Sequence, residues 1–325
     1  MNLLAEKQKR IFDCSISDVE RKRREDEFLK LYYQLRNKDE TRFLGKMSLQ
    51  TRKRLHPLVL LIYTVKNHLG GFTYEIIGNE STKNNRPNIF AVTHVGKFDI
   101  EVISEAIKEH YYLLSGDYEH IQGTVDAPFL AANGVLYFNE NVQNDRISVT
   151  KKMIDLLNTG GNLMYFPEGT WNLSPNLPML PCYWGIIKVA QESNAIITPI
   201  AAEQYGKHFK INIGKNFDAT LFTHDSDGKS EAISQLRDIF ATLKYKIWES
   251  EPQIKRRDLQ GTEWDQYIKE RFSEWPHFNL DYINRLIFKP PGITNSTEAL
   301  RPLKEVIPTT ENAFLFNKRL LPDFE

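Results

Sequence analysis

The pattern that most constrains the fold of this chain lies between residues 88 and 213, where short apolar runs alternate with amphipathic stretches. A short β-branched run is typical of a buried strand, and apolar residues spaced three or four apart are typical of a helix packed on a sheet. Strands that alternate with helices in this way predict an α/β protein. We therefore expect a mixed, mostly parallel sheet flanked by helices.

The expected elements follow from these runs. Strands are expected at 88–93, 112–114, 134–138, 163–166, 196–201 and 209–213. Helices between them are expected at 100–110, 145–158 and 185–191.

Helical patterns also flank this region on both sides. Ser17 and Glu20 form a capping box, because each side chain can bond a backbone N–H of the other's turn. Further helices are expected at 49–68, 231–249 and 263–274. The predicted layout is an N-terminal helical arm (1–71), an α/β core (72–216) and a mostly helical C-terminal extension (217–325).

Composition excludes several classes of protein. The 42 Lys and Arg equal the 42 Asp and Glu, whereas a general nucleic-acid binder usually carries a basic excess. A hydrophobic content of 41% is enough for a folded core. The two cysteines, Cys14 and Cys182, cannot form a disulfide framework, so a reducing compartment is expected.

The chain shows no apolar run of transmembrane or signal-peptide length. We expect a cytoplasmic protein that is peripheral on the inner face of the membrane. Residues 1–80 hold 16 Lys and Arg against 11 Asp and Glu, a net charge of +5. Within this basic arm, Arg52, Lys53 and Arg54 precede the apolar run 57–65 and could contact anionic lipid. The alternative is that the apolar run packs on the core.

Residues 93–99, Thr-His-Val-Gly-Lys-Phe-Asp, are the sharpest local feature, because they follow an expected strand and open an expected helix. Open α/β sheets place their ligands at the carboxyl ends of strands. If the loop turns back at Gly96, Asp99 can orient the ring of His94 and leave the other ring nitrogen as a base. The alternative is a hydrogen-bonded loop histidine and a helix-capping aspartate.

Residues 165–172, Tyr-Phe-Pro-Glu-Gly-Thr-Trp-Asn, end another expected strand. Glu168 can hold hydroxyl groups of a ligand there, and Gly169 lets a ligand approach backbone N–H groups. By itself the segment also fits an ordinary turn with a helix cap.

Together the two segments resemble the motifs of the glycerolipid acyltransferase family, the lysophosphatidic acid (1-acylglycerol-3-phosphate) acyltransferases. The His-x4-Asp motif precedes Phe-Pro-Glu-Gly-Thr by about 70 residues. Gly-Val-Leu-Tyr-Phe (134–138) lies between them, and Ile-Thr-Pro-Ile (197–200) follows. The resemblance covers about residues 89–213.

The resemblance implies transfer of a fatty acyl group from an acyl-CoA or acyl carrier protein thioester to the hydroxyl of a lysophospholipid-like acceptor. His94 would be the general base and Asp99 its orienting partner. It implies neither a metal nor a cofactor. The residues that would position the acceptor are Glu168, Gly169 and Thr170.

Three other positions bear on the substrates. Pro199 matches the last motif, which shapes the acyl-donor side of the site. The Arg that usually contacts the acceptor phosphate is replaced by Glu140, and Trp171 replaces a second Arg. Arg146, Lys97 and Lys188 are the nearest substitutes. Arg binds phosphate through two parallel hydrogen bonds, and two such residues are replaced here. A non-phosphorylated sugar or glycolipid acceptor is therefore an alternative. A non-catalytic lipid- or acyl-carrier-binding protein is another.

Overall fold

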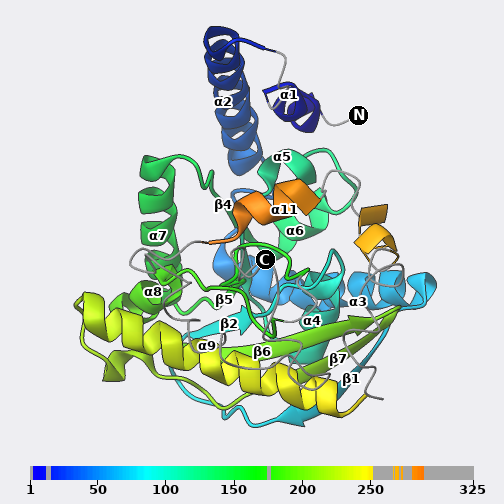
Figure 1. Cartoon of the computed structure of the whole chain (residues 1–325), viewed down its shortest axis with the longest axis vertical. Helices are drawn as coiled ribbons and strands as arrows, with labels where there is room; N and C mark the ends of the chain where they lie inside the picture. The colour runs from blue at the N-terminus through cyan, green and yellow to red at the C-terminus, as the bar shows by residue number, and fades with distance from the viewer. Residues whose placement is uncertain are drawn as a thin grey trace, which may run out of the picture.

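The computed structural model describes residues 3–11, 16–173, 177–251, 266, 268–270, 272–273 and 280–288. A sheet runs through its centre, with helices on both faces (Figure 1). The mixed α/β architecture expected from the alternating pattern is therefore confirmed.

The sheet has seven strands in the order β1-β7-β6-β2-β5-β3-β4. Neighbouring strands run parallel except β6 and β7, which form an antiparallel pair. As a result β1 and β7 run opposite to the other five strands. The strand bounds are β1 Thr73–Asn79, β2 Asn88–Val92, β3 Tyr112–Ser115, β4 Val135–Tyr137, β5 Leu163–Tyr165, β6 Ile196–Tyr205 and β7 His208–Ile213.

Strand β1 is the one strand that the sequence pattern missed. It lies at the edge of the sheet, pairs with β7 and leaves much of its length exposed. An edge strand needs no continuous apolar run, so its sequence, Thr-Tyr-Glu-Ile-Ile-Gly-Asn, carries little signal. Strand β6 also runs beyond its expected end, because Glu203 pairs with Lys210 in the hairpin.

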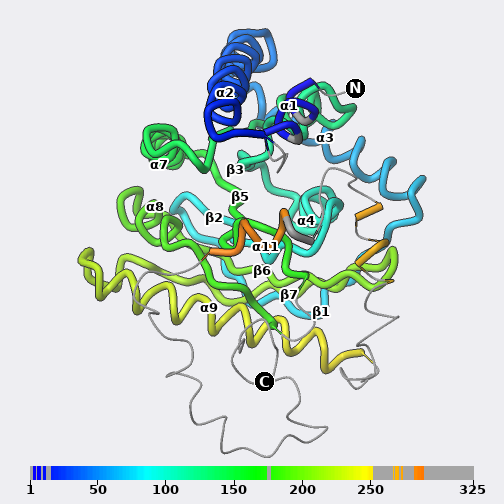
Figure 2. The backbone as a smooth tube through the Cα atoms, turned by 45° about the horizontal axis from the view of Figure 1, so that its top comes forward, coloured from blue at the N-terminus to red at the C-terminus, as the bar shows by residue number. Residues whose placement is uncertain are grey.

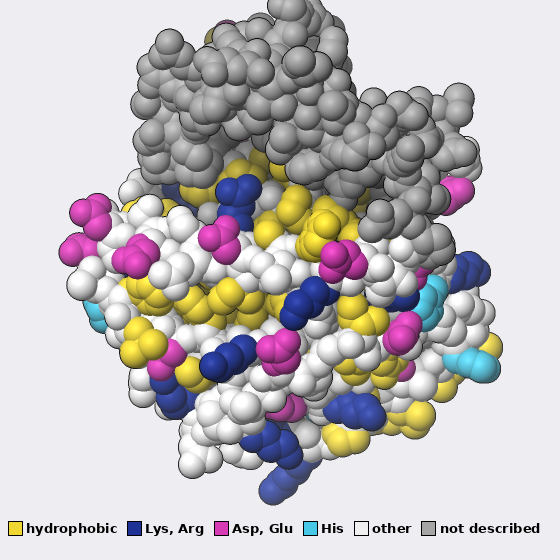
Figure 3. Space-filling model, turned by 60° about the horizontal axis from the view of Figure 1, so that its bottom comes forward, with side chains coloured by type: hydrophobic (Ala, Val, Ile, Leu, Met, Phe, Trp, Pro, Cys, Tyr) yellow, Lys and Arg dark blue, Asp and Glu magenta, His cyan; other side chains and the backbone are white. Residues whose placement is uncertain are grey.

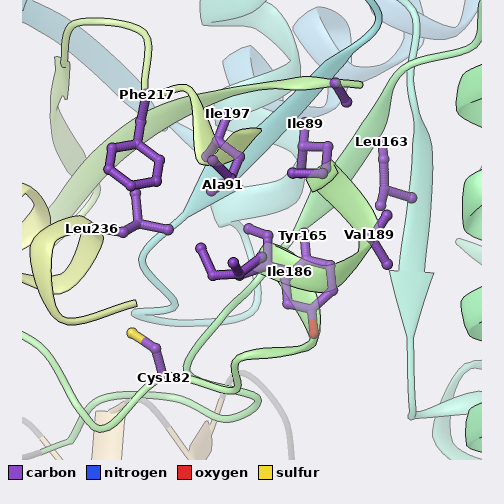
Figure 4. Close-up of a cluster of buried hydrophobic side chains, with 14 of the residues drawn as sticks. Ile89, Ala91, Leu163, Tyr165, Cys182, Ile186, Val189, Ile197, Phe217 and Leu236 are labelled. Carbon is purple, nitrogen blue, oxygen red and sulfur yellow. The ribbon is translucent and has the colours of Figure 1, made fainter. Parts of the chain in front are cut away.

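Alternate residues of the central strands enter two different cores. Ile89 and Ala91 of β2 lie in one apolar cluster, whereas Phe90 and Val92 lie in the other. This two-residue period is the geometry of a strand buried on both faces. Figure 4 shows the first cluster, where Ile89, Ala91, Leu163 and Ile197 of the sheet meet Ile186 and Val189.

The two clusters are closed by different helices (Figures 1 and 2). The first is covered by α7 (Gln143–Asn158), α8 (Gly185–Ser193) and α9 (Ser226–Glu249). The second is covered by α4 (Asp99–Ile107), α5 (Tyr118–Ile121) and α6 (Ala127–Asn133). Helix α3 (Leu49–Gly70) packs against α4 and α6. A short 3-10 helix, η1 (Ala219–Leu221), precedes α9.

The first two helices, α1 (Leu3–Ile11) and α2 (Asp18–Thr41), lie at one end of the molecule, dark blue in Figure 1. The capping box is present in part, since the Ser17 side chain accepts the Glu20 N–H at 3.3 Å. Tyr32 of α2 packs edge-on against Tyr118 of α5. Two hydrogen bonds of 2.6 and 2.9 Å join the Arg36 guanidinium to the Asp145 carboxylate of α7.

Among the described residues, no helix is both long and apolar enough to span a bilayer. On the face shown in Figure 3, Lys and Arg side chains lie interspersed with Asp and Glu. Cys182 is buried, and Cys14 lies outside the described residues. The helix expected at 263–274 falls largely outside them as well.

Candidate active site

His94 and Asp99 lie in contact at the carboxyl end of β2. The ring Nδ1 of His94 is 2.7 Å from Oδ2 of Asp99. This is the contact that the spacing of the two residues predicted. Because Nδ1–H donates a hydrogen bond to the Asp99 carboxylate, the neutral ring keeps Nε2 as the nitrogen that can accept a proton.

The loop that joins β2 to α4 holds His94 and Asp99 in position. Asp99 is the first residue of α4, and its Oδ2 also accepts the backbone N–H groups of Val95 at 3.0 Å and Gly96 at 3.3 Å. Three donors therefore hold this one oxygen in place at the start of α4. The buried Thr93 hydroxyl accepts the Ala202 N–H at 2.9 Å, which fastens the loop to β6.

Aromatic rings surround the imidazole of His94. Phe166 stacks on it with ring centroids 4.2 Å apart, and Trp171 meets it edge-on at 6.1 Å. The Asn172 N–H donates to the His94 carbonyl at 2.8 Å. The His94 side chain is 17% exposed, so the ring is held firmly but stays accessible.

The charge around His94 favours its protonated form. Burial lowers the pKa of His94, but the charge and hydrogen bond of Asp99 outweigh burial, with smaller contributions from Glu168 and Asp117, so the pKa is raised above its usual 6.5. A base with a raised pKa is a stronger proton acceptor and is fully available only at higher pH.

Glu168 lies beneath the His94 loop, with no exposed surface. Its Oε2 accepts the His94 backbone N–H at 2.9 Å, and its Oε1 accepts the Leu180 N–H at 2.8 Å. Both oxygens are therefore bonded to backbone groups. We expected this carboxylate to hold hydroxyl groups of an acceptor. In the structure it instead accepts backbone N–H groups from two loops and so joins them.

Gly169 adopts the left-handed conformation, with φ of 70°. A Cβ at this position would lie 2.5 Å from Cε2 of Tyr183. A glycine is required here for both reasons. The turn brings Thr170 beside His94 at the wall of a cavity.

This cavity has a volume of about 910 Å³ and includes His94 in its wall. Its other walls come from the segments that follow β3, β4 and β5, and from α7. One wall is formed by the end of α11 (Leu280–Leu286) and the residues after it, where Phe288 stacks on Tyr183 at 4.4 Å. The cavity therefore lies at the strand ends, where an open α/β sheet binds its ligands.

Charged side chains of both signs line the cavity. The cations are Lys97, Arg146 and Arg285, and Arg146 also donates to the Glu140 carbonyl. Glu140 lines the cavity too. Its pKa is raised to about 7 by burial and by the charges of Asp117 and Glu119, although the charge of Arg146 lowers it. The sequence singled out Lys97, Arg146 and Lys188, and Lys188 does not line this cavity. It missed Arg285, because this residue lies far along the chain in a segment without a motif.

The structure brings most of the expected site residues together. Gly169 and Thr170 line the cavity, and the Thr170 hydroxyl, 3% exposed as a residue, has no hydrogen-bond partner within the described part of the chain. Pro199 is not brought there: it is buried in β6, where it pairs with Ala91. Trp171 lines the cavity too, and it packs in an apolar cluster with Leu173.

No group of three or more His, Cys, Asp or Glu side chains is placed to hold a metal ion in the residues described. The Cys182 thiol is buried, and burial raises its pKa well above the usual value. It is therefore poorly suited to act as a nucleophile.

Comparison with known proteins supports the reading of the two motifs. Residues 73–203 match the acyltransferase family. A solved structure with a similar fold is the 1-acyl-sn-glycerophosphate (LPA) acyltransferase PlsC from Thermotoga maritima. It is 15% identical, with a TM-score of 0.48, over 66% of this chain and 95% of that one. No curated protein sequence matches the chain. The family match over residues 73–203 includes both motifs at the strand ends, so this part of the chain is similar to the acyltransferase family.

Proposed function

We propose that the protein transfers a fatty acyl group from an acyl-CoA or acyl carrier protein thioester to the hydroxyl of a lysophospholipid-like acceptor. The observation that carries the proposal is the 2.7 Å contact between His94 and Asp99 in the wall of a cavity of about 910 Å³. A base with a fixed tautomer beside a ligand-sized cavity is suited to deprotonating an alcohol.

The chemistry needs one proton acceptor and an activated acyl donor. Nε2 of His94 takes the proton of the acceptor hydroxyl as its oxygen attacks the thioester carbonyl carbon. The tetrahedral intermediate then collapses, the carbon–sulfur bond breaks, and the imidazolium returns the proton to the thiolate. Asp99 stabilises the imidazolium between the two proton transfers.

Groups that stabilise the oxyanion must come from donors that are not already engaged. The N–H of Gly96 donates to Asp99, and the N–H of Gly169 donates to the Phe166 carbonyl at 3.1 Å. The Thr170 hydroxyl has no such partner in the described part of the chain, and Thr170 lies in the cavity wall. We therefore assign to Thr170 a hydrogen bond to the substrates, and to Glu168 the positioning of the His94 loop.

The walls of the cavity suit molecules with fatty chains. Leu114, Val149 and Met153 line it on the α7 side, and Ile121 and Leu130 line it on the side of α5 and α6. A charged rim and apolar walls fit an amphipathic substrate. Lys97, Arg146 and Arg285 are the cations placed to meet a phosphate of the acceptor.

An exposed apolar stripe on α3 supports docking on a membrane surface. Arg54 is exposed beside it, whereas Arg52 is buried and bonds backbone carbonyls, so only part of the expected basic cluster can reach lipid. Amphipathic helices of this kind insert their apolar side chains at the interface. The residues of the stripe, each at least 50% exposed, are Leu58, Leu61, Val65 and Leu69.

The test is a matrix of acyl donors and acceptors. Acyl-CoA and acyl carrier protein thioesters are combined with lysolipids and glycolipids, thiol release is followed, and products are identified by mass. We expect thiol release that depends on a lysolipid acceptor. Release with none of the acceptors would favour a binding protein, and release with glycolipids alone would replace the acceptor proposed here.

A further inference from the structure

The wall of the cavity between α3 and α4 carries two polar side chains that the motifs do not include. Tyr63 of α3 is 4% exposed and Glu101 of α4 is 6% exposed, and both line the cavity. The Tyr63 hydroxyl and Oε2 of Glu101 have no hydrogen-bond partner within the described residues. Buried polar atoms without partners are uncommon in folded proteins and call for an explanation.

Charge on this wall is already balanced. The Lys66 ammonium donates to Oε1 of Glu101 and to Oδ1 of Asp126, both at 2.6 Å. Lys97, in the same wall, further offsets the charge of Glu101. Two carboxylates therefore lie near two ammonium groups, and the formal charges of this wall sum to zero. What is unsatisfied is hydrogen-bonding capacity.

From this juxtaposition we infer that Tyr63 and Glu101 form a subsite for a neutral, hydroxyl-bearing part of the acceptor headgroup. A ligand hydroxyl donates to Oε2 of Glu101, and the Tyr63 hydroxyl donates to or accepts from a neighbouring ligand oxygen. The inference rests on the proposed acyl transfer and narrows its acceptor to a single-chain lipid with a polyol headgroup.

Other headgroups fit this wall less well. A phosphate monoester is largely dianionic at neutral pH and offers mainly acceptors, so it would meet Oε2 of Glu101 as one acceptor facing another. A quaternary ammonium group has no hydrogen to donate, and would leave both oxygens without partners. A polyol supplies donors and acceptors in adjacent positions, which is what this pair lacks.

The test compares acceptors that differ only in the headgroup. Lysophosphatidylglycerol is compared with lysophosphatidylmethanol of the same acyl chain, using the full chain and one acyl thioester. We expect a KM about tenfold lower for the glycerol headgroup, the factor given by one or two hydrogen bonds. The kcat values should be similar, because the reacting hydroxyl is the same in both.

Two variants then test whether the preference for the glycerol headgroup depends on Tyr63 and Glu101. Tyr63→Phe and Glu101→Gln should each raise the KM for lysophosphatidylglycerol about five- to tenfold and leave that for lysophosphatidylmethanol unchanged. Tyr63→Phe removes only an unpaired hydroxyl, so its melting temperature should not fall. Tyr32→Phe is the matched control, because the Tyr32 hydroxyl is also buried with no hydrogen-bond partner among the described residues, but Tyr32 does not line the cavity.

The possible results separate the two proposals. Thiol release with neither acceptor would overturn the proposed acyl transfer itself. Equal KM values for both acceptors, unaltered in Tyr63→Phe, would leave acyl transfer standing and refute the polyol subsite. In that case water alone would pair the two oxygens.

Discussion

The carboxylate of Glu168 accepts the backbone N–H of His94 at 2.9 Å, across 74 positions of the chain. Its other oxygen accepts the N–H of Leu180 at 2.8 Å. One buried side chain thus joins the loop after β2, the loop after β5 and the segment that leads to α8. The position of the candidate base depends on this junction.

Replacing Glu168 by Gln tests the junction. The amide keeps one acceptor oxygen and turns an N–H₂ toward the second backbone N–H, so the free energy of unfolding should fall by about 1–3 kcal/mol. We also expect a lower kcat with little change in KM, since the carboxylate touches no substrate. Denaturant unfolding and steady-state kinetics measure both quantities. Glu192→Gln on exposed α8 surface is the control, and a loss no larger than that of the control would refute the structural role.

The dependence of activity on pH follows from the pKa of His94. Because Asp99 raises this pKa, kcat/KM should fall as the pH drops through a value above the usual 6.5, where the ring becomes protonated. In Asp99→Asn the carboxylate charge is gone and burial still lowers the pKa, so the acid limb should move to lower pH. The maximal rate should also fall by about 10²–10⁴, because the tautomer is no longer fixed.

A pH–rate profile of both proteins measures these changes. An acid limb that stays in place in Asp99→Asn would show that another group titrates.

The turn at Gly169 gives a prediction about stability. In Gly169→Ala the new Cβ would lie 2.5 Å from Cε2 of Tyr183, and the residue would also hold a φ of 70°. The left-handed conformation alone costs an alanine about 1–2 kcal/mol. Gly160→Ala is the control for that cost, because Gly160 has a φ of 81° and no heavy atom within 4 Å of its ideal Cβ.

We expect Gly169→Ala to lose about 1–3 kcal/mol more than the control, as overpacked sites do. Thermal or denaturant unfolding measures the difference. Equal losses would mean that Tyr183 moves aside freely.

The apolar stripe on α3 predicts binding to lipid. Leu61→Glu combined with Val65→Glu should weaken cosedimentation with vesicles of phosphatidylcholine and phosphatidylglycerol by at least about tenfold, because two apolar side chains no longer enter the interface. Val19→Glu, at an 83% exposed position of α2, serves as the control. If the double variant binds vesicles as strongly as the wild type, α3 does not contribute to the docking surface.

Much of the fold and the contact between His94 and Asp99 could be predicted from the sequence. The strands of the buried centre carry continuous apolar runs, and the spacing of His94 and Asp99 lets a tight loop join them. Local pattern is sufficient in both cases, because the partners are close along the chain or the strand is buried on both faces. The edge strand β1 gave no such signal.

The rest of the site depends on contacts between distant segments. Glu168 was expected to face a ligand, and it faces two backbone N–H groups instead, which no local pattern shows. Arg52 was expected at the surface, and it is buried against carbonyls of Met47 and Ala132. Tyr63, in the expected helical arm, reaches the cavity only because α3 packs on α4 and α6.

The account depends most directly on His94 as the base for acyl transfer, and His94→Gln tests it because the amide can still contact Asp99. The measurement is acceptor-dependent thiol release, corrected for thioester hydrolysis and compared at equal folded fraction. We predict that kcat falls by about 10²–10⁴ in the variant while its melting temperature stays close to that of the wild type. Acyl transfer at the wild-type rate in His94→Gln would contradict the mechanism.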